Sequence, residues 1–188
     1  MESHFIHTAT LKNGLMYNGD MRKAKIGDIG LYSISGPLGW IISIGQAAVG
    51  DGSKYTHAFI ITDQNEVLAA QPRGARYDPL HIYYGRSAVL DVPLTDLQRA
   101  LIVENARKLE GVKYGFSGYL YIILSAFNIR PKWLVNYVTN NGRMICSQLV
   151  DFVYAQSGVH LFDDGRQPFD VTPGDLADLI WKDYKLNG

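Results

Sequence analysis

The sequence contains a single cysteine, Cys146, among 188 residues. One thiol excludes an internal disulfide, and it excludes a zinc site built from several cysteines. An excess of either charge is also lacking, because 18 basic and 18 acidic residues give a net charge of zero. A chain without net positive charge has no overall attraction to nucleic acid or to anionic lipid. We therefore expect no nucleic-acid partner.

Long uninterrupted apolar runs are missing as well. The two longest, 38–49 and 119–127, are shorter than the roughly 20 residues that cross a bilayer as a helix, although either could contact a membrane surface. The first residues are polar and lack the basic region followed by an apolar region that marks a secretory signal. These absences predict a soluble, cytoplasmic protein, and they leave export by another route open.

The order of the expected elements indicates the fold class. Runs of β-branched and aromatic residues predict strands at 26–34, 55–62, 67–71 and 88–92, with a tyrosine-rich loop at 72–85. Helical spacing and capping residues predict helices at 95–110, 118–128, 131–139, from 146 and from 172. The segment 38–49 fits a short buried helix or the wall of a pocket.

Strands followed by helices predict an α+β fold in which a small antiparallel sheet packs against helices. The length is sufficient for one domain with a substantial core and does not require a second. We therefore expect residues 1–188 to form a single domain, in which 1–25 are an N-terminal arm or an edge strand.

Cys146 is placed where a helix is expected to begin. Apolar residues follow it at helical spacing, namely Leu149, Val150 and Val153. Gly158 is placed to end the helix. A cysteine at a helix start lies beside unpaired backbone N–H groups and the positive end of the helix dipole, which both favour the thiolate. Cys146 is thus a candidate nucleophile, and the alternative is a small buried residue of the core.

His57 is a candidate for the base that a nucleophilic cysteine needs. It lies in the expected strand 55–62, and a hairpin turn returns the chain through 67–71. In this hairpin His57 and Gln71 can lie near one another. An imidazole can take the proton of a thiol and later give it to a leaving group. The alternative is a hydrogen-bonded histidine inside the sheet.

We expect neither a metal nor a cofactor. The remaining histidines, which show no metal-ligand spacing, are His4, His7, His81 and His160. No phosphate-binding loop with its lysine follows the glycines near residue 36. A site built from a thiol and an imidazole needs no additional group for acyl transfer.

Four short motifs occur in an order that is typical of one family. They are Gly27-Asp28-Ile29, the histidine within Tyr-Thr-His-Ala-Phe-Ile-Ile, a glycine and a tyrosine at Gly111 and Tyr114, and the cysteine within Ile-Cys-Ser-Gln-Leu-Val. The sequence from about Gly27 to about Leu179 resembles the circularly permuted papain-like hydrolases. These are relatives of the NlpC cell-wall peptidases and include the YiiX-like and lecithin retinol acyltransferase groups. In permuted members the histidine precedes the cysteine, as here.

The resemblance implies a papain-like fold with Cys146 as nucleophile and His57 as general base. In the family a third polar residue on the following strand orients the histidine, and the matching position here is Ala69, which cannot do so. Gln71 lies on the same face of that strand, and its amide oxygen is the candidate for this role. The implied function is a cysteine peptidase or amidase acting through a thioester on Cys146. Its substrate would be peptide-like or acyl, with cell-wall peptidoglycan as one example.

Two other functions stay open. The apolar segments 38–49 and 119–127 suggest a thiol acyltransferase or lipid hydrolase of the retinol acyltransferase type. Ala69 suggests a catalytically inactive binding module with the same fold. A groove lined by polar and charged residues would favour the amide hydrolase, a closed apolar tunnel the acyltransferase, and separation of Cys146 from His57 the binding module. For either enzyme we expect the Cys146 Sγ within about 4 Å of a His57 ring nitrogen.

Overall fold

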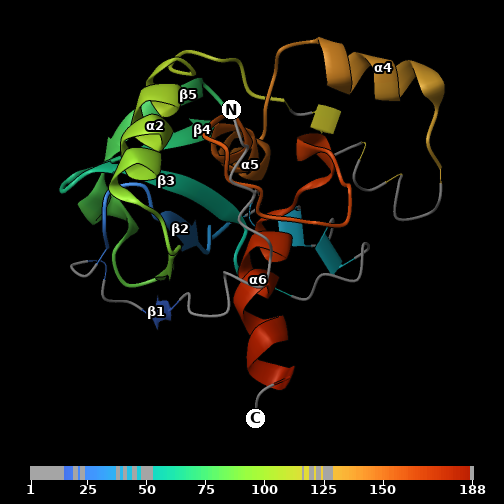
Figure 1. The fold of residues 1–188 in the computed structure, drawn as a ribbon. Helices are drawn as coiled ribbons and strands as arrows, with labels where there is room; N and C mark the ends of the chain where they lie inside the picture. Colours follow the sequence, from blue (N-terminus) through green and yellow to red (C-terminus); the bar gives the residue numbers. More distant parts are fainter. Residues whose placement is uncertain are drawn as a thin grey trace.

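The computed structural model has a mixed α+β architecture, in which helices pack against an antiparallel sheet (Figure 1). The structure describes residues 15–18, 21, 24–36, 39, 42, 43, 46, 47, 53–115, 117, 118, 121, 124 and 129–186. The expected fold class is confirmed at this level. Most of 38–49 and of 118–128 lies outside the described residues, and those described within them are helical.

Six strands form the sheet in the order β1-β6-β2-β3-β4-β5, and all neighbouring pairs are antiparallel. They are β1 (Leu15–Asn18), β2 (Ile29–Tyr32), β3 (His57–Asp63), β4 (Glu66–Gln71), β5 (Gly74–Pro79) and β6 (Ser87–Asp91). β1 and β5 are the two edges. Because β1 pairs with β6, residues 15–18 form an edge strand, which was one of the two alternatives for the N-terminal region.

β3 and β4 form the expected hairpin. Ile60 pairs with Leu68, and Ile61 pairs with Val67. His57 is the first residue of β3 and Gln71 the last residue of β4, so both lie at the open end of the hairpin. Apart from Asp63 every residue of β3 is buried.

The prediction of a loop at 72–85 was wrong. β5 pairs with β4 along its whole length, and the 3-10 helix η3 (Leu80–Tyr83) follows it. Gly74 opens β5 with a φ of 109°, a conformation that favours glycine. No strand was predicted for 74–79 because its buried and exposed positions do not alternate, so the sequence lacks the usual strand pattern, and because Pro79 is typical of loops. Proline is tolerated at the end of an edge strand, where it breaks no ladder hydrogen bond.

Four α-helices are described: α2 (Asp96–Arg107), α4 (Lys132–Asn140), α5 (Cys146–Gln156) and α6 (Pro173–Leu186). α2 and α5 pack against each other and against β3, and α5 also packs against β4. The capping box at the start of α2 is confirmed, since the Gln98 N–H donates to the Thr95 hydroxyl at 3.2 Å and the Gln98 side chain accepts from the Thr95 N–H at 2.9 Å. No described helix is long and apolar enough to span a bilayer.

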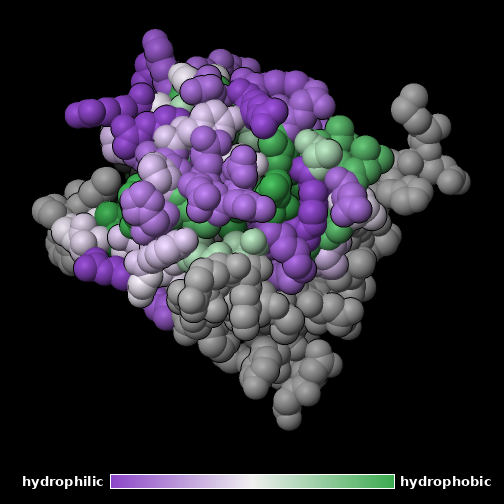
Figure 2. Space-filling view, turned by 90° about the vertical axis from the view of Figure 1, so that its left-hand side faces the viewer, coloured by the Kyte–Doolittle hydropathy of each residue, from purple (hydrophilic) through white to green (hydrophobic). Residues whose placement is uncertain are grey.

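Each face of the sheet carries an apolar cluster. The cluster beneath α2 and α5 includes Ala58, Ile60, Leu68, Ala70, Ile102, Cys146, Leu149 and Val153. The cluster on the opposite face includes Phe59, Ile61, Val67, Ala69, Tyr83 and Val89. Neighbouring residues of β3 belong to different clusters because successive side chains of a strand point to opposite faces. On the side of the molecule shown in Figure 2, hydrophilic side chains cover much of the described surface.

The Gly27-Asp28 motif ties the start of β2 to two helices. Asp28 is fully buried, and its carboxylate accepts a hydrogen bond of 2.8 Å from Arg99 of α2. The Tyr154 hydroxyl of α5 donates to the Gly27 carbonyl. Burial raises the pKa of Asp28, and the hydrogen bond from Arg99 opposes that shift. The motif therefore holds the helices on the sheet.

Arg99→Ala should lower the free energy of unfolding at pH 7 by about 3 kcal/mol, because it leaves a buried carboxylate without its partner. Since the folded-state pKa of Asp28 is raised, the folded state takes up a proton before the unfolded chain does, and the deficit should shrink as the pH falls below neutral. Urea denaturation over a series of pH values measures this. Lys108→Ala, at the C-terminal cap of the same helix, is the control, because the ion pair of Lys108 with Glu104 is exposed and should add nothing measurable. Equal losses in the two variants would contradict the prediction.

Candidate functional site

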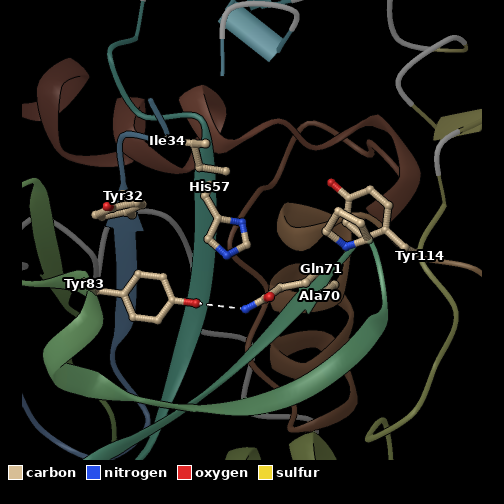
Figure 3. A pocket seen from close by; sticks show the side chains of 8 residues that line it. Tyr32, Ile34, His57, Ala70, Gln71, Tyr83 and Tyr114 are labelled. Atoms are coloured by element: carbon tan, nitrogen blue, oxygen red, sulfur yellow. Dashed lines mark hydrogen bonds between the residues drawn. The ribbon is translucent and has the colours of Figure 1, made fainter. Parts of the chain in front are cut away.

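A pocket of about 240 Å³ lies where β3 begins and β4 ends. The residues that line it are Tyr32, Ile34, His57, Ala70, Gln71, Pro72, Tyr83 and Tyr114 (Figure 3). Three of them are tyrosines, and none is Lys, Arg, Asp or Glu. The described lining is therefore aromatic and apolar, with the imidazole and one amide as polar groups beside the tyrosine hydroxyls.

His57 is buried in this pocket, with 5 % of its surface exposed. Its ring stacks on that of Tyr83, at a centroid distance of 6.0 Å and an interplanar angle of 26°. Burial lowers the pKa of His57 to about 4, and the charge of Asp78 acts weakly in the opposite direction. His57 is therefore neutral at pH 7, which is the form that can accept a proton.

Gln71 lines the same pocket, so the structure brings it together with His57 as expected. Its amide nitrogen donates to the Asp78 carboxylate and, at 3.2 Å, to the Tyr83 hydroxyl (Figure 3). An amide has donors on nitrogen and acceptors on oxygen. Because Asp78 and Tyr83 hold the nitrogen, the oxygen is the end of Gln71 that can accept a hydrogen bond from an imidazole N–H.

Asp78 is the buried acid of the site, and the sequence analysis missed it. It is 7 % exposed, accepts a hydrogen bond of 2.8 Å from the Tyr83 hydroxyl, and lies 3.3 Å from the Arg76 guanidinium. Burial and the adjacent carboxylate raise the pKa of Tyr83, which keeps the hydroxyl protonated as a donor. The sequence feature that could have indicated Asp78 is the Pro72-Arg73-Gly74 turn, because such a turn is typical of a second hairpin and would place Asp78 on the strand beside Gln71.

Ala69 is the residue that the resemblance to the permuted papain-like hydrolases matches to their third polar residue. It is fully buried in the apolar cluster that also contains Phe59 and Tyr83. A methyl group there cannot hold an imidazole. The polar contacts of the hairpin are instead made two residues later, at Gln71.

Cys146 is the first residue of α5, as expected, and Gly158 follows the helix with a φ of 74°. The Ile145 N–H at the cap donates to the Gln148 side chain at 3.1 Å. Cys146 is 1 % exposed, lies in the apolar cluster beneath α5, and is not among the described residues that line the pocket. Both expectations for the helix are confirmed, while the nucleophilic role stays a prediction.

The segment that leads into α5 runs beside the pocket. Met144, two residues before Cys146, forms a parallel bridge with Tyr114, which lines the pocket. α5 itself packs against β3, the strand that begins at His57. The ring of His57, however, contacts Tyr83 on the opposite face of the sheet. The distance of about 4 Å between the Cys146 Sγ and a His57 nitrogen therefore stays a prediction.

Metal chemistry has no evident support in the described residues. They contain no group of three or more His, Cys, Asp or Glu that could hold a metal ion. What the pocket can do chemically follows from its neutral imidazole, its oriented amide and its tyrosine hydroxyls. An imidazole that is neutral and shielded from water can move a proton between two groups that enter the pocket.

The low pKa of His57 predicts a specific pH dependence of stability. The unfolded chain takes up a proton near pH 6.5, whereas the folded protein does so only at about 4, so stability should be lost as the pH falls between these values. The shift corresponds to roughly 3 kcal/mol. Asp151 has the opposite effect on stability, because burial raises its pKa to about 6 and the folded protein therefore binds this proton before the unfolded chain does as the pH falls.

Subtracting the urea stability profile of His57→Gln from that of the wild type isolates the His57 contribution. We expect the difference between the two proteins to shrink from pH 7 to pH 4. Parallel profiles would show that His57 titrates normally in the folded protein. The imidazole signals in nuclear magnetic resonance spectra give a second reading, since they should stay those of the neutral ring well below pH 6.

The comparisons with known proteins give this site no family precedent. No family model matches the chain, and no curated protein matches it. The resemblance to the permuted papain-like hydrolases rests on short motifs and stays a prediction. The function has to be argued from the geometry and chemistry of the site.

Proposed function

We propose that this protein is a cysteine hydrolase of papain-like type that cleaves an amide or peptide bond. Cys146 is the nucleophile, and His57 is the general base. One observation carries the proposal: the helix that begins at Cys146 packs against the strand that begins at His57. The Tyr114 bridge to Met144 supports it, because the chain enters this helix along the wall of the His57 pocket.

The reaction follows from the groups at hand. The Cys146 sulfur attacks the carbonyl carbon while its proton passes to His57, and the backbone N–H groups at the start of α5 stabilise the oxyanion. His57 then gives the proton to the leaving amine, which leaves a thioester. Water attacks the thioester, His57 takes a proton from that water, and the thiol is restored as the acid departs.

The pKa of His57 decides the resting state of this site. With a pKa of about 4, an imidazolium is unfavourable at pH 7. The pair therefore rests as a thiol and a neutral imidazole, and proton transfer accompanies attack. The helix start still favours developing negative charge on sulfur. Gln71, held by Asp78 and Tyr83, positions His57 through the amide oxygen.

The size and lining of the pocket favour a short neutral group as its occupant. About 240 Å³ is small beside the roughly 300–1,000 Å³ of sites for drug-sized ligands. An amino-acid side chain or a short acyl group fits, whereas a long acyl chain needs more room. The described part of the lining has no cation to pair with a carboxylate. These features favour a peptide or amino-acyl substrate, for example a neutral part of a cell-wall peptide, over transfer of a long acyl chain.

A binding module is the second candidate, and the position of Cys146 favours it. The thiol is buried among apolar side chains and does not line the pocket. The ring of His57 lies against Tyr83 on the other face of the sheet. In this alternative the tyrosine-lined pocket holds a small neutral ligand without bond cleavage.

Intact-protein mass spectrometry separates the two functions. After incubation with cell-wall peptides and short activated acyl esters, the wild type should carry an acyl adduct that Cys146→Ala lacks. The alanine variant should keep nearly full stability, because alanine replaces most of the volume of a thiol. A ligand that raises the melting temperature of both proteins without adduct or turnover would contradict the hydrolase and support the binding module.

Gln71→Ala should lower turnover about ten- to a hundredfold, roughly 1.4 to 2.7 kcal/mol of barrier, because His57 loses its acceptor. Gln71→Glu should not restore turnover, because a carboxylate cannot donate to Asp78 as the amide nitrogen does and would repel the Asp78 carboxylate. The matched control is Gln64→Ala, in the turn at the other end of the same hairpin. Steady-state kinetics on the substrate found by mass spectrometry measures this. Full activity of Gln71→Ala would show that another group orients His57.

A further inference from the structure

One part of this neutral chain carries charge of a single sign. Between Glu110 and Asp151 the sequence contains no acidic residue. The basic residues in this interval are Lys113, Arg130, Lys132 and Arg143. A local excess of positive charge attracts anionic surfaces even where the net charge of the whole molecule is zero.

The same interval contains α4, which exposes large apolar side chains at its start. Trp133 is 66 % exposed, and Ile129, just before the helix, is 50 % exposed. Leu134 is buried and packs the helix against the rest of the protein. α4 lies at the periphery, away from the sheet (Figure 1). Tryptophan prefers the interface between membrane and water, where its ring is partly buried and its N–H stays hydrated.

Basic side chains flank α4 at both ends. Arg130 and Lys132 are exposed at its beginning, and Arg143 is exposed shortly after its end. The Met144 N–H donates to the Lys113 carbonyl at 3.1 Å, which places Lys113 beside Arg143. Exposed apolar side chains next to basic ones are features of a helix that lies in the plane of an anionic membrane surface.

We propose that Ile129, Arg130, Lys132, Trp133 and Arg143 form a docking surface for anionic phospholipid membranes. Trp133 and Ile129 enter the boundary between headgroups and acyl chains, while the basic side chains contact lipid phosphates and carboxylates. A nucleic acid would pair with the cations but would leave Ile129 in water, so a lipid surface fits better. The proposal is independent of the hydrolase, although the surface adjoins the pocket, since Arg143 lies beside Lys113, the residue before Tyr114.

Co-sedimentation of the full chain with vesicles tests the electrostatic part. Phosphatidylcholine vesicles that contain phosphatidylserine should bind the protein at low salt, and pure phosphatidylcholine vesicles should bind it much less. Arg130→Glu with Lys132→Glu should weaken binding at least about twentyfold, given about fivefold per basic side chain lost. Arg86→Glu with Lys108→Glu changes the net charge equally at two exposed positions elsewhere and should leave binding unchanged.

Trp133→Ala tests the apolar part against Leu97→Ala, which removes a residue that is 70 % exposed on α2. Only the Trp133 variant should lose vesicle binding. Tryptophan emission of the wild type should shift to shorter wavelength on binding, and Trp133→Phe should abolish the shift. Thermal melts show that each variant is folded. Equal binding to both vesicle types, equal loss in the control pair, or binding to an RNA oligonucleotide but not to vesicles would overturn the proposal.

Discussion

The burial of β3 on both faces is the constraint on which the rest of the structure depends. Helices α2 and α5 cover one face of this strand, and the cluster around Phe59 and Tyr83 covers the other. A strand in this position can carry polar side chains only at its ends, since a buried polar group in its middle would lose hydrogen bonds to water. His57 begins the strand, which explains why the imidazole lies where the sheet opens into a pocket.

The buried acid of the site, Asp78, is hydrogen-bonded to Gln71 and Tyr83. Asp78 does not touch the imidazole in the manner of a direct carboxylate partner, because its oxygen holds the amide nitrogen of Gln71 and the hydroxyl of Tyr83. Burial dominates the pKa of His57, whereas a carboxylate bonded directly to the imidazole would raise it. The neutral imidazole is thus a consequence of its burial at the start of β3.

Charge is distributed unevenly over a molecule whose net charge is zero. The acid-free interval contains α4 and leads into α5, while carboxylates follow in the loops and helix beyond. There Arg166 bridges Asp164 and Asp175, at 2.6 and 2.7 Å, and so links the loop to the start of α6. The basic side chains near α4 are, by contrast, exposed to solvent. The net charge of zero does not show that the acid-free interval is basic, because it also counts the carboxylates elsewhere in the chain.

The sequence by itself determined the features that depend on neighbours along the chain. The hairpin at His57, the capping box at Thr95 and the helix that starts at Cys146 were all predicted, because local hydrogen bonds and side-chain periodicity produce them. Only the tertiary structure decided that β5 is a strand, that Asp78 reaches Gln71, and that the ring of His57 stacks on Tyr83. Strand pairing, burial and the resulting pKa depend on segments brought together from distant parts of the chain, and no short pattern of residues contains that information.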